Sequence, residues 1–370
     1  MSATGREPTP ATSPSDLAGS LREAAFVRLV SDATGEALAA TGLLARALDD
    51  TPFQASVVRP FEDPDRTTEA DLTVAVGRAQ SAADVALTDR AAATAFETAR
   101  ELGTADPALA LAGTIAAGEV DGTVAEAATQ AGLERRPGVA VPVADLADGL
   151  AHSTLFVAPF SGEADAARAA MADLDVDPDG TPSDDDGRRL ASLVALAVTE
   201  DAPPRAADAV QRALRPAVGG PFETVGGYAD VLDAVARERP GTAVALALGH
   251  EVVREDALDA WRTHARRAHE AVADATTGRY DGLFVARVDD DAPAPVVARL
   301  LRDFRSPEPV ALALADDAAA AAAVEDRGIA GAMARTVTRT GGSYDGTATT
   351  GYATYECETK EFTHAFREVL

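Results

Sequence analysis

The sequence has 370 residues, of which 46% are hydrophobic but only 5% aromatic, so a core large enough for two domains must be built mainly from Ala, Val and Leu. It contains 60 acidic and 33 basic residues, which gives a formal net charge of -27, and Lys360 is its single lysine. No apolar run reaches the length of a membrane span, and the one cysteine, Cys357, excludes an internal disulfide. We therefore expect a cytoplasmic protein without a membrane partner.

The acidic residues occur in every segment rather than in one tail, which is typical of a surface adapted to multimolar salt. Such salt screens charges strongly, and hydrated carboxylates then keep a protein soluble without the usual self-repulsion. We interpret the composition as adaptation to the salt-rich cytoplasm of a halophilic archaeon. The negative net charge therefore does not exclude nucleic acid as a partner, because binding at high salt depends on stacking and hydrogen bonds rather than on counterion release.

The first half of the chain predicts a tail followed by an α/β domain. Residues 1–20 are rich in Ser, Thr, Pro and Gly, so we expect a disordered tail and no secretory signal there. In residues 21–200, strand and helix patterns alternate, which predicts a doubly wound, mostly parallel sheet with a helical connector. The expected strands are residues 25–30, 53–58, 72–76 and 84–87, and the expected helices follow Gly35 and span residues 89–102, 108–117, 163–173, 188–199 and 205–214.

The acidic loop at residues 173–187 imitates the start of a calcium-binding EF-hand, because aspartates alternate from Asp175 to Asp179 before a glycine. Asp186 stands where the twelfth-position Glu would be, and two prolines interrupt the loop. We therefore interpret residues 173–187 as a solvated, mobile linker and not as a calcium site.

The second half predicts a smaller α/β domain. Gly219-Gly220-Pro221 breaks the chain, so we expect a domain boundary between residues 200 and 222 and a second domain over residues 222–370. The expected helices are residues 225–237, 255–276, 295–304 and a terminal helix, and the expected strands are residues 242–248, 282–288, 309–314 and 352–356.

The most informative segment is the first strand–turn–helix, residues 30–35. A carboxylate there, Asp32, would lie at the carboxyl edge of the sheet, where α/β proteins bind ligands. The alternative is a Ser/Asp/Thr turn that only caps the following helix. Asp89 follows the strand at residues 84–87 and is a second acidic candidate.

This segment resembles the first motif of the DHH-family phosphoesterases, which include the RecJ-like nucleases. The family motif reads His-x-Asp-x-Asp-Gly before a helix of small residues and paired leucines, and Gly35–Leu44 looks like that helix. Val30 stands at the position of the His, Asp32 at the first Asp and Thr34 at the second. Asp89 is similar to the Asp of the Asp-His-His signature, with Arg and Ala in place of both histidines.

Further segments in the family's order extend the resemblance over most of residues 25–370. Asp148–Ser153 looks like the connector of archaeal RecJ-like proteins, and we expect its His152 to cap or pack rather than to bind metal. Leu232–Arg237 is similar to the Leu-Asn-Ala-x-Gly-Arg of the DHH-associated domain, and Gly341-Gly342-Ser343 to its Gly-Gly-His loop. The resemblance implies substrate-binding roles for Arg237, Gly341, Gly342 and Ser343 and a DHH-type domain followed by a DHH-associated domain.

The family uses several carboxylate and imidazole ligands to hold a pair of metal ions. Here only Asp32 and Asp89 remain as candidate catalytic residues, and Asp32 is the candidate metal ligand. We therefore expect no resident cofactor, and we expect Mn or Mg to bind only if the protein is active. The leading hypothesis is a RecJ-like protein of nucleic-acid metabolism that has lost catalysis and serves as a single-strand-binding or scaffold protein. The alternatives are an active Mn- or Mg-dependent single-strand exonuclease and a nucleotide or phosphoester binding module. The expected partners are single-stranded nucleic acid and proteins of replication, repair or RNA metabolism.

Overall fold

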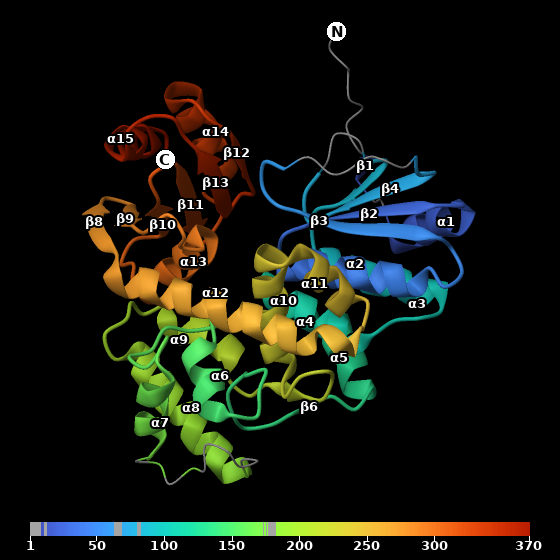
Figure 1. Cartoon of the computed structure of the whole chain (residues 1–370), viewed down its shortest axis with the longest axis horizontal. Coiled ribbons are helices and arrows are strands. Elements are labelled where there is room, and N and C mark those ends of the chain that lie inside the picture. The colour runs from blue at the N-terminus through green and yellow to red at the C-terminus, as the bar shows by residue number, and fades with distance from the viewer. Residues whose placement is uncertain are drawn as a thin grey trace. The chain divides into compact units, whose positions relative to one another are not determined.

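The computed structural model describes residues 9–10, 13–62, 69–79, 83–172, 174, 176 and 183–370 (Figure 1). The chain forms two compact units that interleave along the sequence. Unit 1 comprises Met1–Arg136, Ala140–Ala144 and Pro216–Trp261, and unit 2 comprises Pro137–Val139, Asp145–Arg215 and Arg262–Leu370. These units do not coincide with the expected ranges 21–200 and 222–370, because residues 216–261 bury their apolar side chains in the core of unit 1.

Unit 1 is built on a five-stranded parallel sheet of order β1-β5-β4-β2-β3. The strands are β1 (Thr9–Pro10), β2 (Val27–Asp32), β3 (Phe53–Val58), β4 (Leu72–Val76) and β5 (Val85–Leu87). From β2 the chain moves outward to β3 and then returns to β4 on the other side, so the strand order changes direction between β2 and β4. Such a switch point is where open α/β sheets leave a crevice at the carboxyl ends of their strands. The predicted α/β class with a parallel sheet and a separate C-terminal sheet domain is confirmed.

Helices cover this sheet, and α2 and α11 lie beneath it in the view of Figure 1. The helices of unit 1 are α1 (Pro14–Glu23), α2 (Gly35–Ala47), α3 (Ala91–Leu102), α4 (Pro107–Ala117), α5 (Gly122–Gln130), α10 (Val225–Glu238), α11 (Pro240–Ala247) and the short η2 (Glu251–Val253). A two-residue pair, β6 (Glu134–Arg135) with β7 (Ala217–Val218), joins segments that are distant in the sequence.

In the core of unit 1, the indole N–H of Trp261 donates a hydrogen bond to the Asp230 carboxylate at 2.9 Å, which satisfies both buried polar groups.

Two predictions in unit 1 are wrong. Residues 14–20 of the expected tail are helical, because Ser13 caps α1 and Leu17 and Leu21 are buried in the core. Residues 242–248, expected as a strand, belong largely to α11, which Pro240 starts. A short apolar run of Ala, Val and Leu fits either a buried strand or a buried helix, and here the alanines and the N-terminal proline favour the helix.

Unit 2 begins with helices and ends in a six-stranded sheet of order β12-β13-β11-β10-β9-β8, in which only β9 and β10 pair in parallel. Helix α12 (Arg254–Asp274) runs from unit 1 into unit 2. The other helices are α6 (Leu146–His152), α7 (Ala164–Ala172), α8 (Asp184–Thr199), α9 (Ala206–Ala209), η1 (Val210–Ala213), α13 (Ala294–Phe304), α14 (Ile329–Thr340) and α15 (Thr359–Val369). The strands are β8 (Thr276–Tyr280), β9 (Leu283–Arg287), β10 (Val310–Leu314), β11 (Ala318–Ala323), β12 (Tyr344–Gly346) and β13 (Thr350–Thr354).

The six alanines of β11 form an inner strand of this sheet, which the sequence does not predict. Alanine is the best helix former, but β11 pairs antiparallel with both β10 and β13. Five of its six residues are at most 3% exposed. Burial and pairing on both sides therefore override the local preference of the segment.

The acidic loop is only partly described. Residues 173, 175 and 177–182 lie outside the described residues, so the expected linker is not tested there. Helix α8 begins at Asp184, earlier than expected, because Ser183 and Asp186 form a reciprocal capping box. The Asp186 side chain, the twelfth position of the imitated calcium loop, accepts the Ser183 N–H at 3.0 Å. Among the described residues, no helix is both long and apolar enough to cross a membrane.

Candidate functional site at the switch point of the parallel sheet

Asp32 is the last residue of β2 and therefore lies at the carboxyl edge of the sheet, as predicted. One carboxylate oxygen accepts the N–H of Ala33 at 2.9 Å. Thr34, at the position of the second Asp of the DHH motif, is the N-cap of α2, and its hydroxyl accepts the Ala37 N–H at 3.3 Å. The capping alternative is thus correct for Thr34, whereas Asp32 remains at the edge with a side chain that is 20% exposed.

A guanidinium lies beside Asp32. Arg78 follows β4, and its Nη2 is 3.9 Å from Oδ1 of Asp32, so the pair spans the switch point between β2 and β4. Gly77 makes this approach possible because its φ is +88° and a Cβ there would come within 2.9 Å of the Asp32 Cβ. The Arg78 side chain is only 19% exposed, so the charge pair is partly withdrawn from solvent.

A second arginine, Arg59, lies at the same edge of the sheet, because it directly follows β3. Its Nε donates to the backbone carbonyl of Arg237 at 3.0 Å, and its Nη2 to that of Glu238 at 3.4 Å. These carbonyls belong to the last turn of α10, where a helix favours cationic groups. The backbone carbonyl of Arg59 in turn accepts a 3.5 Å hydrogen bond from Arg78. Arg59 therefore links Arg78 to the end of α10.

Arg237 belongs to unit 1, together with Asp32, and not to the C-terminal sheet domain. Its Nη1 is 2.6 Å from Oδ1 of Asp233, one turn earlier on α10. The same Asp233 oxygen accepts the N–H of Gly35 at 3.0 Å, so Asp233 ties Arg237 to the first residue of α2. We call the group of Asp32, Arg59, Arg78, Asp233 and Arg237 the switch-point cluster.

Asp89 follows β5, whose carboxyl end lies at the same edge of the parallel sheet as that of β4. Its side chain is exposed. The charge of Asp89 acts on Glu36 in the first turn of α2. Burial raises the pKa of the Glu36 carboxyl above its ordinary value, and the negative charges of Asp89 and Glu119 add to that rise. Backbone hydrogen bonds from Ala91 and Ala92 act in the opposite direction.

The donor set of this edge does not fit a metal pair. In the part of the chain that the structure describes, no three His, Cys, Asp or Glu side chains gather in a group that could hold a metal ion. Two close divalent ions need bridging carboxylates to offset their repulsion, but the neighbour of Asp32 here is the cation of Arg78.

An uncharacterized protein, rrnAC1427 of Haloarcula marismortui, is 76% identical to this chain over 370 residues, which is 100% of both chains. The chain belongs to the family of the uncharacterized protein rrnAC1427. The model of this family's C-terminal domain matches residues 275–368, which contain the six-stranded sheet of unit 2.

Two solved structures share the fold of the rrnAC1427 family. CDC45 from Entamoeba histolytica is similar with a TM-score of 0.62 and 9% identity, over 98% of this chain and 99% of that one. RecJ from Thermus thermophilus, in complex with Mg²⁺, is similar with a TM-score of 0.50 and 13% identity. The match covers 96% of this chain but 51% of that RecJ chain. The chain therefore has a fold like those of RecJ and CDC45, as its motifs implied.

The glycine loop with predicted substrate-binding residues lies in the rrnAC1427-type C-terminal domain, in unit 2. Gly341 ends α14, and Gly342 has a φ of +102° and would place a Cβ 2.1 Å from the carbonyl oxygen of Thr354. The N–H of Ser343 donates to the Thr354 hydroxyl at 2.9 Å. Gly342 is thus required for packing on β13, and a substrate-binding role for the loop stays a prediction.

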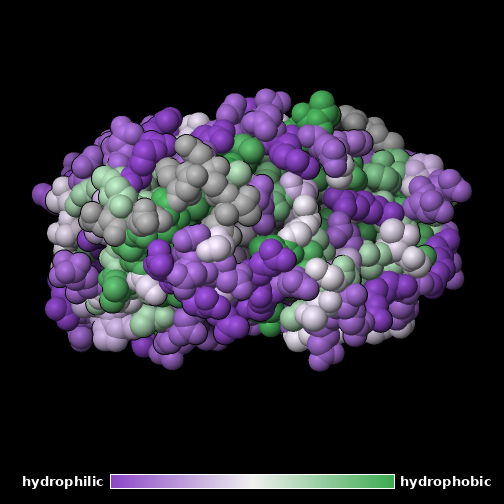
Figure 2. All heavy atoms as spheres, turned by 90° about the horizontal axis from the view of Figure 1, so that it is seen from below, coloured by the Kyte–Doolittle hydropathy of each residue, from purple (hydrophilic) through white to green (hydrophobic). Residues whose placement is uncertain are grey.

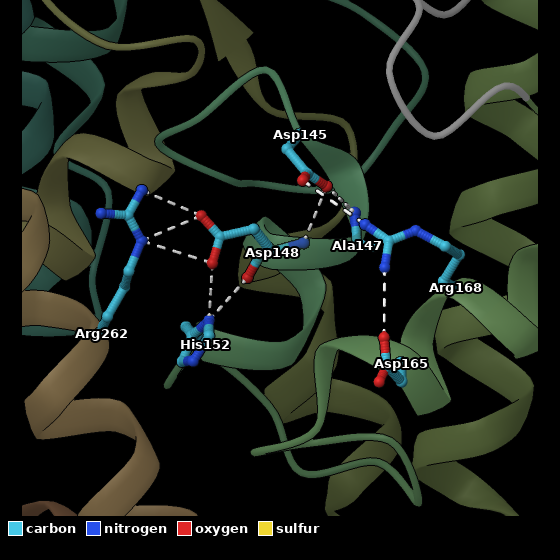
Figure 3. A network of polar contacts seen from close by, with 7 residues as sticks. All are labelled: Asp145, Ala147, Asp148, His152, Asp165, Arg168 and Arg262. Carbon is cyan, nitrogen blue, oxygen red and sulfur yellow. Dashed lines mark hydrogen bonds and ion pairs between the residues drawn. The ribbon is translucent and has the colours of Figure 1, made fainter.

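The connector contains a separate polar network in unit 2, shown in Figure 3. There the Asp148 carboxylate lies between Arg262 and His152, with Nη2 of Arg262 at 3.0 Å and Nδ1 of His152 at 2.9 Å. Burial alone would raise the pKa of Asp148, but the hydrogen bond from His152 and the charge of Arg262 outweigh burial and lower it. Asp145 caps α6 by accepting the N–H of Asp148 at 3.0 Å. As expected, His152 has a packing and hydrogen-bonding position.

A second histidine supports the connector from α12. His269 is fully buried, and burial lowers the pKa of its imidazole to about 4. Its Nε2 lies 2.9 Å from the carbonyl oxygen of Ser153, so the N–H of the neutral ring donates a hydrogen bond to that carbonyl. Among the described residues, its Nδ1 has no hydrogen-bond partner. His269 therefore fixes the end of α6 against α12.

Sequence reasoning found Asp32 and Arg237 but missed Arg59, Arg78, Asp233 and Glu36 as members or neighbours of the site. A usable signal was present, because Arg59 and Arg78 directly follow β3 and the Gly77 turn after β4. The carboxyl ends of parallel strands meet at one edge, so residues that follow them belong to one candidate site.

Proposed function

We propose that this protein binds the phosphate groups of single-stranded nucleic acid at the switch-point cluster and acts as a catalytically silent, RecJ-like scaffold in nucleic-acid metabolism. In this proposal no metal ion takes part in binding. The fold that this chain shares with CDC45 and with about half of the RecJ chain supports a role of this kind.

The position of Arg78 carries the proposal. A guanidinium 3.9 Å from Asp32 compensates the carboxylate that would otherwise attract a divalent ion. A planar guanidinium is also the side chain best matched to phosphate oxygens, which it binds through two parallel N–H donors. In this site Asp32 orients Arg78 and does not act as a catalyst.

Two further arginines surround the same edge and are held in place by their neighbours. Backbone carbonyls at the end of α10 orient Arg59, and Asp233 orients Arg237. Arg59 is 42% exposed, so its guanidinium is accessible to a ligand from solvent. Hydrogen bonds of fixed geometry remain effective at high salt, where long-range attraction to phosphate is screened.

The proposal is tested by fluorescence anisotropy with labelled oligo-dT in high KCl. We expect wild type to bind, and Arg78→Gln and Arg237→Gln each to weaken binding by about tenfold, as loss of a charged hydrogen bond to phosphate predicts. The matched control is Arg100→Gln. Arg100 is an exposed arginine in the last turn of α3, and the first turn of that helix is the one that lies at the carboxyl edge of the sheet. Equal weakening in the control would contradict a specific site.

The length of the strand separates the proposal from a nucleotide-binding module. A strand-binding site should prefer oligo-dT to a mononucleotide by at least about tenfold, because several phosphates contribute. Equal affinity for the two ligands would favour the module. Shortening of the strand during the assay in the presence of manganese would favour an active exonuclease.

We further propose that the protein works in the salt-rich cytoplasm of a haloarchaeon, together with proteins of replication, repair or RNA metabolism. The net charge of -27 and the 76% identical relative in Haloarcula marismortui support this setting. Circular dichroism at decreasing KCl tests it, because a protein adapted to such salt should unfold when its carboxylates are no longer screened.

A further inference from the structure

An open groove of about 630 Å³ lies on unit 2, away from every residue assigned above. Three short segments form it: the 137–139 segment, one face of α8, and the turn at residues 214–215. The lining residues are Pro137, Arg188, Ala191, Ser192, Ala195, Leu214 and Arg215.

The groove is rigidly built. Gly187 brings α8 against the 137–139 segment so closely that a Cβ there would lie 2.3 Å from the carbonyl oxygen of Pro137. On the other side, the Arg215 N–H donates to the Gly138 carbonyl at 3.1 Å, and Val139 forms a β-bridge with Leu214. The groove therefore exists without a ligand.

Arg215 has a strained backbone. Its φ is +53°, in the left-handed region that residues other than glycine rarely adopt. That conformation places an exposed arginine at the rim of the groove. Arg188, which is 63% exposed, lies on the α8 side and has Asp185 as an ion-pair partner at the long distance of 3.8 Å.

Apart from Ser192, the rest of the groove lining is apolar. Ala191, Ala195 and Leu214 line it, and Leu196, one residue beyond Ala195 on α8, is 70% exposed. Figure 2 shows the molecule from below, which is the side where α7 and α8 lie in Figure 1. This surface is largely hydrophilic, and the apolar residues on it form small separate patches. Arg188 and Arg215 thus lie next to apolar side chains on a protein of net charge -27.

We propose that this groove is a docking site for a peptide of a partner protein, in which an acidic residue lies next to a leucine-like side chain. Charge complementarity selects the acidic group, because Arg188 and Arg215 present guanidinium donors that pair with carboxylates. The apolar wall and Leu196 receive the neighbouring side chain. An open groove suits an extended or helical peptide better than an enclosed small molecule. This inference is independent of the nucleic-acid site.

The test uses full-length protein and capped, fluorescein-labelled hexapeptides of alternating Glu and Leu, at the lowest KCl concentration at which the protein stays folded. Matched peptides replace Glu by Gln or Leu by Ser. We expect saturable anisotropy with the Glu-Leu peptide, and binding at least about tenfold weaker for each replacement. Arg215→Gln and Leu196→Ser should each weaken binding of the Glu-Leu peptide by a similar factor.

Arg189→Gln is the matched control, because Arg189 is a neighbouring arginine on α8 that does not line the groove. It should leave peptide affinity within about twofold of wild type, and all variants should keep the wild-type circular dichroism spectrum and affinity for oligo-dT. The proposal is overturned if the Glu-Leu peptide does not saturate, if the Gln peptide binds equally well, or if Arg189→Gln weakens binding as much as Arg215→Gln.

Discussion

At the scale of single residues, the proposed function depends on side chains that need no metal. Thr34 uses its hydroxyl to cap α2, and Arg78 places a cation beside Asp32. In the proposed function this cation, and not a metal ion, pairs with the phosphate of the strand.

Replacing Arg78 by a carboxylate should create an affinity for metal. Arg78→Asp puts a second carboxylate next to Asp32, so we expect calorimetry to detect saturable binding of manganese that wild type lacks, and binding of oligo-dT at least about tenfold weaker than in wild type. Arg78→Gln is the control, because it removes the cation without adding a ligand and should bind manganese at least about tenfold more weakly than Arg78→Asp. Equal manganese binding by wild type and Arg78→Asp would show that the Arg78–Asp32 pair does not govern the site.

Glu36 gives a prediction for the dependence of stability on pH. Burial raises the pKa of its carboxyl in the folded state, so the folded state holds this proton more tightly than the unfolded state. The resulting destabilisation appears as pH rises above the unfolded pKa of about 4.5 and is complete above the folded pKa. Glu36→Gln should therefore stabilise the protein by about 1 kcal/mol at pH 7 and have no effect at pH 4. Urea unfolding at both pH values measures this, and an equal effect at the two would refute it.

At the scale of elements, the sequence predicts those whose local pattern and tertiary environment agree. Strands β3 and β4 have the predicted bounds because β-branched and apolar residues are enclosed by turn residues. Helix α11 and strand β11 were not predicted, since Ala-rich apolar runs fit either structure and only their packing decides. The candidate site was predicted only in part. The motif resemblance named Asp32 and Arg237, whereas Arg59 and Arg78 can be assigned to the site only when the order of the strands is known.

The contact of His269 on α12 with Ser153 at the end of α6 leads us to expect that the stability of the folded protein decreases in acid. His269 stays neutral in the folded state down to a pKa of about 4, but in the unfolded state it takes up a proton near pH 6.5. The unfolded state therefore binds more protons between these values, and stability should fall by roughly 2–4 kcal/mol as pH drops from 6.5 to 4. His269→Gln keeps a donor for the Ser153 carbonyl and should lose most of this dependence. If the variant keeps the wild-type slope of stability against pH, another group is responsible.

At the scale of the whole molecule, the chain interleaves its two units, and this could not be read from the sequence. The glycine-rich break at residues 219–221 suggested a boundary there, but residues 216–261 return to unit 1 and bring Arg237 to the edge that carries Asp32. The resemblance named Asp32 and Arg237 in their order along the chain. Only the three-dimensional contacts of Asp233 with Gly35 and Arg237 assign them to one site.

In the proposed function, the switch-point cluster binds strands without metal and without cleaving them. One experiment measures the affinity of the full-length protein for labelled oligo-dT in high KCl, first in excess EDTA and then at manganese concentrations up to the millimolar range. A gel of the same samples follows the length of the strands. We expect manganese to leave the affinity unchanged, the strands to stay intact throughout, and Arg237→Ala to bind more weakly than Asp32→Ala. Strand digestion that requires manganese and disappears in Asp32→Ala would contradict the proposed function and identify the protein as an active exonuclease.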